Sequence, residues 1–155
     1  MRLIKLAILS VFFLFLVATF ISLLIPSHIR ISKATNIAAS RDSIFERVKD
    51  TLQWRNWHPA FMPQNTAKKF QAITIRTVDV NDSAIVMALN QGNKAPVING
   101  WQVYHTAADS LTLQWYMDFE LKWYPWQKFG SMFYENTYGV MMEQGLANLK
   151  KLVEK

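Results

Sequence analysis

The stretch Leu111–Tyr124, LTLQWYMDFELKWY, decides the fold of this chain of 155 residues. Large apolar residues occupy every second position of this stretch, and mostly polar residues fill the positions between them. A period of two residues predicts a strand with one face on the core and the other on solvent. Asp118 and Glu120 fall on the outward face, which argues against a pair of catalytic carboxylates inside the protein. Pro125 ends the strand.

Shorter runs of β-branched and aromatic residues upstream predict further strands. Turn-forming residues and one loop separate these runs, so consecutive strands can pair in an antiparallel meander. The expected strands cover residues 28–38, 70–78, 84–89 and 101–106. The expected turns and loop cover residues 80–83, 90–96, 99–100 and 109–110.

A helix and an aromatic segment are expected between the first two strands. Ser40 is a typical N-cap residue, and the apolar residues at positions 44, 45 and 48 predict the inner face of the helix behind it. Trp54 and Trp57 share one face of a short helix. They would pin this helix to the core or, with His58, border a pocket mouth or touch a membrane interface. A general acid or base at His58 is the functional alternative, whereas a surface histidine before proline needs no role.

The C-terminal segment Met132–Lys155 carries apolar residues at three- and four-residue spacing, which predicts one long helix. Gly139 and Gly145 lie inside this helix, where each glycine costs about 1 kcal/mol relative to alanine. We therefore expect the helix to approach the sheet closely at these two residues.

An uncharged run of twenty residues, Leu6–Ile25, precedes the first strand and is closed by Pro26. A helix of this length rises about 30 Å, the thickness of a bilayer's hydrocarbon core. The sequence predicts a transmembrane anchor over residues 1–27 and one domain over residues 28–155. A cleaved signal peptide is the main alternative, but its apolar region is about 7–15 residues long and precedes a small-residue cleavage site, which this chain lacks. The anchor residues expected to face lipid include Leu6, Phe13, Phe15, Phe20 and Ile25.

Basic residues flank both ends of the apolar run. Arg2 and Lys5 favour an N-terminus in the cytoplasm, whereas Arg30, Lys33 and Arg41 favour the reverse. We expect the first orientation, with the domain outside the cytoplasm, because basic residues before a short N-terminal anchor usually dominate. The formal net charge is +6 and the basic residues are scattered, which argues against nucleic acid as a partner and suits anionic lipid headgroups.

No motif assigns a catalytic residue, a metal or a cofactor. The chain has no cysteine, and the spacing of its three histidines fits no metal-ligand pattern. The glycine-rich phosphate-binding motifs and the G-x-S-x-G motif of hydrolases are also missing from the sequence.

Several motifs together resemble the START-like superfamily, SRPBCC, in its polyketide cyclase/dehydrase and lipid-transport branch. ISKATNIAA at 31–39, SIFERVKD at 43–50 and WRNWHP at 54–59 are similar to the family's opening strand, helix and aromatic segment. WYPWQKF at 123–129 and the helix at 139–155 resemble its final strand and helix. The resemblance covers about residues 29–155 and is strongest at the two ends, while residues 60–100 match in pattern only.

This resemblance implies an α+β helix-grip fold, in which a curved antiparallel sheet wraps around the long C-terminal helix. In the family, the space between sheet and helix is a pocket for apolar ligands. The alternative for each expected lining residue is a place in a packed core, where methionine fills gaps. The expected lining residues are Trp101, Trp115, Met117, Phe119, Tyr138, Met141 and Met142.

We therefore expect a membrane-anchored START-like domain that binds a hydrophobic small molecule or lipid. A cyclase or dehydrase acting in the same cavity is one alternative, and its candidate polar groups are His58, His105, Tyr104 and Tyr138. A ligand-free protein-interaction domain is the other. Fold alone does not decide among them.

Overall fold

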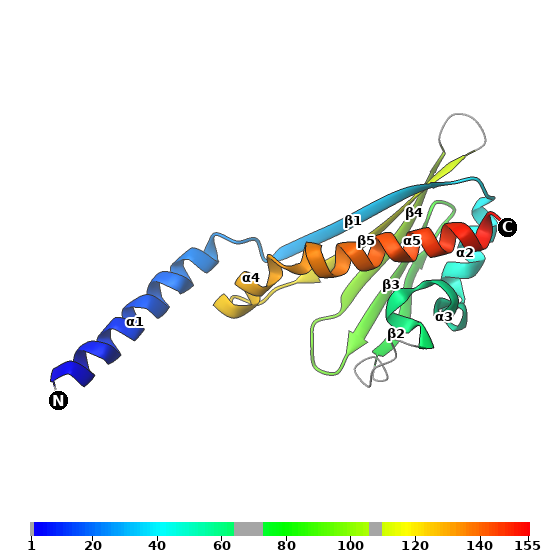
Figure 1. Ribbon diagram of the computed structural model, residues 1–155. Coiled ribbons are helices and arrows are strands. Elements are labelled where there is room, and N and C mark those ends of the chain that lie inside the picture. Colours follow the sequence, from blue (N-terminus) through cyan, green and yellow to red (C-terminus); the bar gives the residue numbers. More distant parts are fainter. Residues whose placement is uncertain (1, 64–72, 106–109) are drawn as a thin grey trace.

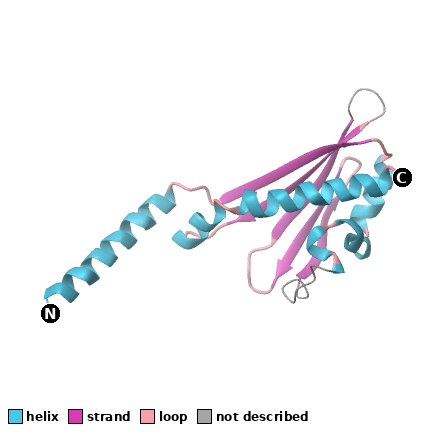
Figure 2. Cartoon of the chain, viewed as in Figure 1, coloured by secondary structure: helices cyan, strands magenta, loops and turns pink. Residues whose placement is uncertain are grey.

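The structure is a computed structural model that describes residues 2–63, 73–105 and 110–155 (Figure 1). In this part of the chain, five strands form one antiparallel sheet in the order β1-β5-β4-β3-β2. The helices other than α1 and α4 lie against one face of the sheet (Figures 1 and 2). The strands are β1 (His28–Ile37), β2 (Ile73–Val80), β3 (Ala84–Gln91), β4 (Val97–His105) and β5 (Leu111–Glu120).

The helices bracket the sheet in sequence. Those before β2 are α1 (Arg2–Leu23), α2 (Arg41–Lys49) and α3 (Trp54–Trp57), with 3-10 turns at Thr51–Gln53 and Pro59–Phe61. Those after β5 are α4 (Pro125–Ser131), a π-helical turn (Glu135–Gly139) and α5 (Val140–Val153). Ser40 caps α2 as expected, because its side chain accepts a hydrogen bond from the backbone N–H of Ser43.

The strand β5 lies inside the sheet, paired with β1 on one side and β4 on the other. Its inward row is buried, as the alternation of apolar residues predicts. The strand ends at Glu120, three residues before the apolar alternation stops, so Leu121–Tyr124 lies outside the ladder. Asp118 is on the outward face, but Arg30 covers it with two hydrogen bonds of 2.7 Å.

The expected turn at residues 99–100 is wrong, because both residues lie within β4. Gly100 faces Tyr116 of β5, and a Cβ on Gly100 would lie 2.0 Å from the tyrosine ring. The guanidinium of Arg30 lies 4.3 Å from the centre of the same ring. The glycine thus makes room for a stacked side chain in the middle of a strand.

Two other expected segments lie partly outside the described residues. The strand expected at 70–78 is β2, which runs from Ile73 to Val80. Residues 70–72 lie outside the described residues. Val80, expected in a turn, belongs to the strand. The turn expected at 109–110 also lies partly outside them, since residue 109 is not described.

The expected long C-terminal helix is confirmed from Tyr134 to Val153, with a π-helical turn at Glu135–Gly139 in its first part. It begins two residues later than expected, because Met132 and Phe133 lie in a turn. The segment 123–129, expected to resemble a final strand, instead contains α4, because Pro125 at the first helical position needs no N–H partner. The expected close approach is confirmed at Gly145, where a Cβ would lie 2.7 Å from Trp115 and 3.2 Å from Pro59. At Gly139 it would lie 3.1 Å from Lys33 of β1.

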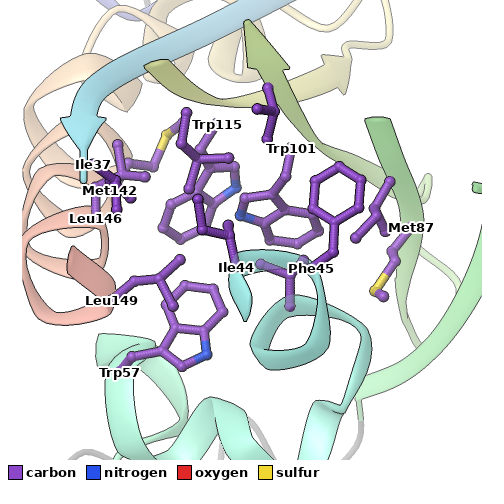
Figure 3. Packing of buried hydrophobic residues seen from close by; sticks show 14 of the residues in the cluster. Ile37, Ile44, Phe45, Trp57, Met87, Trp101, Trp115, Met142, Leu146 and Leu149 are labelled. Carbon is purple, nitrogen blue, oxygen red and sulfur yellow. The ribbon is translucent and has the colours of Figure 1, made fainter. Parts of the chain in front are cut away.

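The core between sheet and helices is built on aromatic rings (Figure 3). Trp54, Trp57, Trp101 and Trp115 are all fully buried. The indole N–H groups of Trp54 and Trp57 donate to backbone carbonyls of α2, at 2.8 and 3.2 Å. Large rings with satisfied N–H groups stabilise the fold through burial without a polar penalty.

The helix α1 projects away from the sheet (Figure 1). It is the one helix among the described residues that is long and apolar enough to cross a membrane. Only 6% of its apolar window is buried, so it is not a core helix of a soluble fold. A signal sequence at the N-terminus would meet the same length and composition criteria.

Candidate functional site

A partly open cavity of about 380 Å³ lies at the end of the sheet where α1 joins it. The ends of β3, β4 and β5 form one wall, and the π-helical turn with the residue before it forms the other. Its apolar lining residues are Leu89, Ala95, Pro96, Val97, Phe119, Leu121, Tyr134 and Tyr138. Its polar lining residues are Gln91, Asn93, Lys94, Glu120, Lys122 and Gln127.

Three aromatic rings meet across the cavity, Phe119 from β5 and Tyr134 and Tyr138 from the helical wall. The ring of Phe119 lies 4.9 Å from that of Tyr134 and 4.7 Å from that of Tyr138. The two tyrosine rings meet edge to face at 5.3 Å. Burial, with Tyr134 nearby, raises the pKa of Tyr138 above its ordinary value of 10.0, so its hydroxyl stays neutral. A neutral hydroxyl can both donate and accept a hydrogen bond.

An ion-pair cluster holds the π-helical turn against β1. The Lys33 ammonium lies 2.7 Å from a Glu135 carboxylate oxygen and 2.8 Å from one of Glu143. Hydrogen bonds to these carboxylates, Glu135 first, raise the pKa of Lys33 to about 12. Gly139 leaves space for the Lys33 stem. The cluster therefore fixes the turn that carries Tyr138, and π turns are frequent at functional sites.

Two buried donors lie deeper on the same face of the sheet. Asn99 is fully buried, and its Oδ1 accepts a 3.1 Å hydrogen bond from Trp115 Nε1. Asn99 Nδ2 and Trp101 Nε1 have no hydrogen-bond partner in the described structure. Each unmade bond of this kind costs about 1–3 kcal/mol. Because side chains alternate, Asn99 is the next inward residue after Val97, which lines the cavity.

The structure brings only part of the expected lining to this cavity. Phe119 and Tyr138 line it. Met117 is buried beside Phe119 on the inward row of β5, and Met141 packs partly buried against the core. The fully buried members of the expected set belong to the core and not to the lining of this cavity: Trp101, Trp115 and Met142.

The expected pocket rim is corrected, because Trp54, Trp57 and His58 are interior residues. His58 is 2% exposed, and its ring stacks on that of Trp54 with centres 5.2 Å apart. Its Nδ1 accepts a hydrogen bond from the Ala60 N–H at 3.2 Å. Burial lowers the pKa of His58 from 6.5 to about 3. His58 is therefore a neutral core residue and not a surface group.

The other polar groups considered for catalysis do not converge. Tyr104 lies on the outer face and donates to Gln114 Oε1 at 2.9 Å, and His105 is exposed at the far end of β4. Of these candidates, Tyr138 alone lines the cavity. Among the described residues, no group of three or more His, Asp or Glu side chains could hold a metal ion.

Sequence reasoning missed Leu89, Val97 and Tyr134 as lining residues. Tyr134 had a signal, because it lies four residues before Tyr138 and so shares its helical face. Leu89 and Val97 flank the expected loop at 90–96, and no sequence pattern shows how this loop folds back over the end of β5.

Comparisons with known proteins identify the fold. No family model and no curated protein matches the sequence. The chain is similar to the solved structure of a START superfamily protein from Mycobacterium smegmatis, with TM-score 0.56, 20% identity, and coverage of 81% of this chain and 97% of that chain. It is similar to XoxI from Bacillus cereus, with TM-score 0.57, 11% identity, and coverage of 80% and 94%.

A third similar structure is the di-domain ARO/CYC protein StfQ of the steffimycin biosynthetic pathway, with TM-score 0.60 and 10% identity. The match covers 82% of this chain and 51% of StfQ. Similarity at these identities shows the fold alone. The chain has the α+β START-like fold, a five-stranded antiparallel sheet with a long C-terminal helix.

Proposed function

We propose that this protein is a membrane-anchored START-like domain that binds a hydrophobic small molecule or lipid in the cavity between the sheet and the π-helical turn. The observation that carries the proposal is the apolar and aromatic lining of that cavity. Its volume of about 380 Å³ lies within the usual range for small-molecule sites.

The lining indicates a mainly apolar ligand with few polar atoms. Phe119, Leu89 and Val97 supply apolar surface, and the hydroxyls of Tyr134 and Tyr138 supply hydrogen bonds at the wall. An acceptor that reached Asn99 Nδ2 would satisfy a buried donor that has no protein partner. A carbonyl or hydroxyl oxygen at one end of a hydrocarbon fits this arrangement.

We favour binding over catalysis because, of the four polar groups considered for catalysis, only Tyr138 lines the cavity. The ARO/CYC description of StfQ supports a small-molecule site in this fold. Because aromatic and aliphatic side chains fill the core between sheet and helices, we place the ligand in the cavity at one end of the domain.

The anchor in this proposal covers residues 1–27 and contains α1, and the domain over residues 28–155 lies outside the cytoplasm. A helix of 22 residues rises about 33 Å, enough to span the hydrocarbon core. Its side chains are exposed along nearly the whole length, as lipid-facing residues would be.

Mass spectrometry of small molecules that copurify with the detergent-extracted full chain tests the binding site. We expect an apolar compound with the native protein and its loss from a Val97→Phe variant, because the larger ring fills the cavity. Ile98→Phe is the matched control, since residue 98 points to the opposite face of β4 and should retain the compound. Equal compound in both variants would contradict the site.

Carbonate extraction with intact-mass measurement tests the anchor. We expect the chain to stay in the membrane pellet with its mass including residues 1–27. A soluble chain shortened by those residues would show that α1 is a cleaved signal sequence.

A further inference from the structure

An exposed apolar patch lies on and beside α4, and nothing proposed so far uses it. It consists of Trp123, Trp126, Met132 and Phe133, which are 58% to 68% exposed. We call these residues the α4 patch. Soluble proteins rarely leave large apolar side chains clustered on the surface without a partner.

The α4 patch is fixed to the end of α1. Lys128 of α4 is buried, and its ammonium donates to the Ile25 carbonyl at 2.7 Å and to the Ser27 hydroxyl at 2.8 Å. The backbone N–H of Leu121 donates to the Ser27 carbonyl at 2.7 Å. Figures 1 and 2 show α4 beside the connection between α1 and β1, at the opposite end of the domain from the C-terminus.

From this position we propose that the α4 patch lies in the lipid headgroup layer of the bilayer that α1 crosses, as a second and interfacial membrane contact. The inference rests on the proposed anchor. If α1 spans the hydrocarbon core, Ile25 lies at its boundary, and the headgroup layer beyond is about 5–8 Å thick on each side. Because the Lys128 side chain of α4 bonds to the Ile25 carbonyl, this geometry sets α4 at that layer.

The side chains of the α4 patch suit this layer. Tryptophan and tyrosine are enriched at membrane–water interfaces, where an apolar ring and a polar tip are both satisfied. Tyr124 stacks on Trp126 with ring centres 4.8 Å apart, which extends the aromatic surface beside the patch. The exposed ammonium of Lys122 can reach lipid phosphates from the same segment.

This placement brings the cavity to the bilayer surface. Leu121, Lys122 and Gln127, which flank the α4 patch in sequence, also line the cavity. An apolar ligand would then pass between the bilayer and the cavity without crossing bulk water. In this proposal, lipid covers the α4 patch. The alternative that the experiment tests is that a second copy of the chain or another protein covers it.

Tryptophan fluorescence of the full chain in nanodiscs made with brominated phosphatidylcholine tests the proposal. The chain has six tryptophans, and only Trp123 and Trp126 are exposed, while the other four are fully buried in the core. Bromine quenches rings that touch lipid, so we expect part of the native emission to be lost, up to the share of two tryptophans. The double variant Trp123→Phe/Trp126→Phe should show no quenching. Trp101→Phe is the matched control, because its substitution removes a buried ring and breaks no hydrogen bond of the indole N–H. The emission that this variant loses to brominated lipid should equal the emission that the native chain loses.

Native emission that brominated lipid leaves unchanged would overturn the inference, and a protein seated on the α4 patch would give that result. Carbonate extraction of the same chain from liposomes of the same lipid separates the two proposals. A chain held in the pellet but unquenched keeps its anchor and loses the interfacial contact, whereas a chain released from the pellet loses both. Near-ultraviolet circular dichroism shows whether each variant has kept the folded core.

Discussion

Trp115 joins the buried aromatic cluster to the C-terminal helix. Its ring lies 5.5 Å from that of Trp101, 5.9 Å from that of Trp57 and 4.9 Å from that of His58. The ring also bounds the space above Gly145 of α5. Because Trp115 is fully buried against these rings and α5, substitutions that contact it should lower the free energy of unfolding.

Replacing Gly145 with alanine should destabilise the protein. The new Cβ would meet Trp115 at 2.7 Å and Pro59 at 3.2 Å, and such overpacking costs about 1–3 kcal/mol, which exceeds the gain of about 1 kcal/mol in helix propensity. Gly130→Ala in α4 is the control, since nothing lies within 4 Å of its added Cβ. Thermal unfolding in detergent should give a lower Tm for Gly145→Ala only; a rise in both variants would contradict the packing described.

His58 should make stability depend on pH. Its pKa is 6.5 in the unfolded chain and about 3 in the folded one, so the unfolded chain binds the proton first as pH falls. The free energy of unfolding should therefore fall by about 1.4 kcal/mol per pH unit between about pH 6 and pH 4 on account of this residue. His58→Phe keeps a ring in the stack and should lower the slope by that amount in denaturant titrations. Equal slopes for both chains would show that His58 can take up a proton in the folded state.

Two elements, α4 and the π-helical turn, together form the end of the domain that carries the cavity. The turn presents Tyr138, and α4 joins the domain to α1 through Lys128. Neither element follows from apolar periodicity, because the π turn departs from the 3.6-residue period and α4 is only seven residues long.

Replacing Lys128 with methionine should loosen the junction between α1 and the domain. The variant keeps the apolar stem but removes the donor to Ile25 and Ser27, and hydrogen bonds from a charged group contribute about 1.5–3 kcal/mol. Hydrogen exchange should then quicken at the Leu121 amide, which bonds to Ser27. Lys122→Met, at an exposed position nearby, is the control. Equal exchange in the two variants would mean that Lys128 does not hold the junction.

In the molecule as a whole, α1 and α4 lie at one end of the domain (Figure 1). The cavity is at the same end, because Leu121, Lys122 and Gln127 line it. Helix-grip architecture was predictable, since the strand at β5, the cap at Ser40 and the close approach at Gly145 each have a local sequence signal. The cavity was predictable only at Phe119 and Tyr138. The position of the cavity depends on how the large rings fill the core. The alternation of apolar residues predicts that a side chain points inward, but it does not show whether that side chain contacts other protein atoms or an open cavity.

Photo-crosslinking of the full chain in its native membrane tests the binding site most directly. A benzophenone amino acid in place of Tyr138 would project into the cavity, and one in place of Tyr104 would lie on the outer face of the sheet. We predict that irradiation attaches an apolar small molecule to the chain at position 138 and none at position 104, as measured by intact mass. An unmodified chain at position 138, or the same adduct at both positions, would contradict a hydrophobic ligand in this cavity.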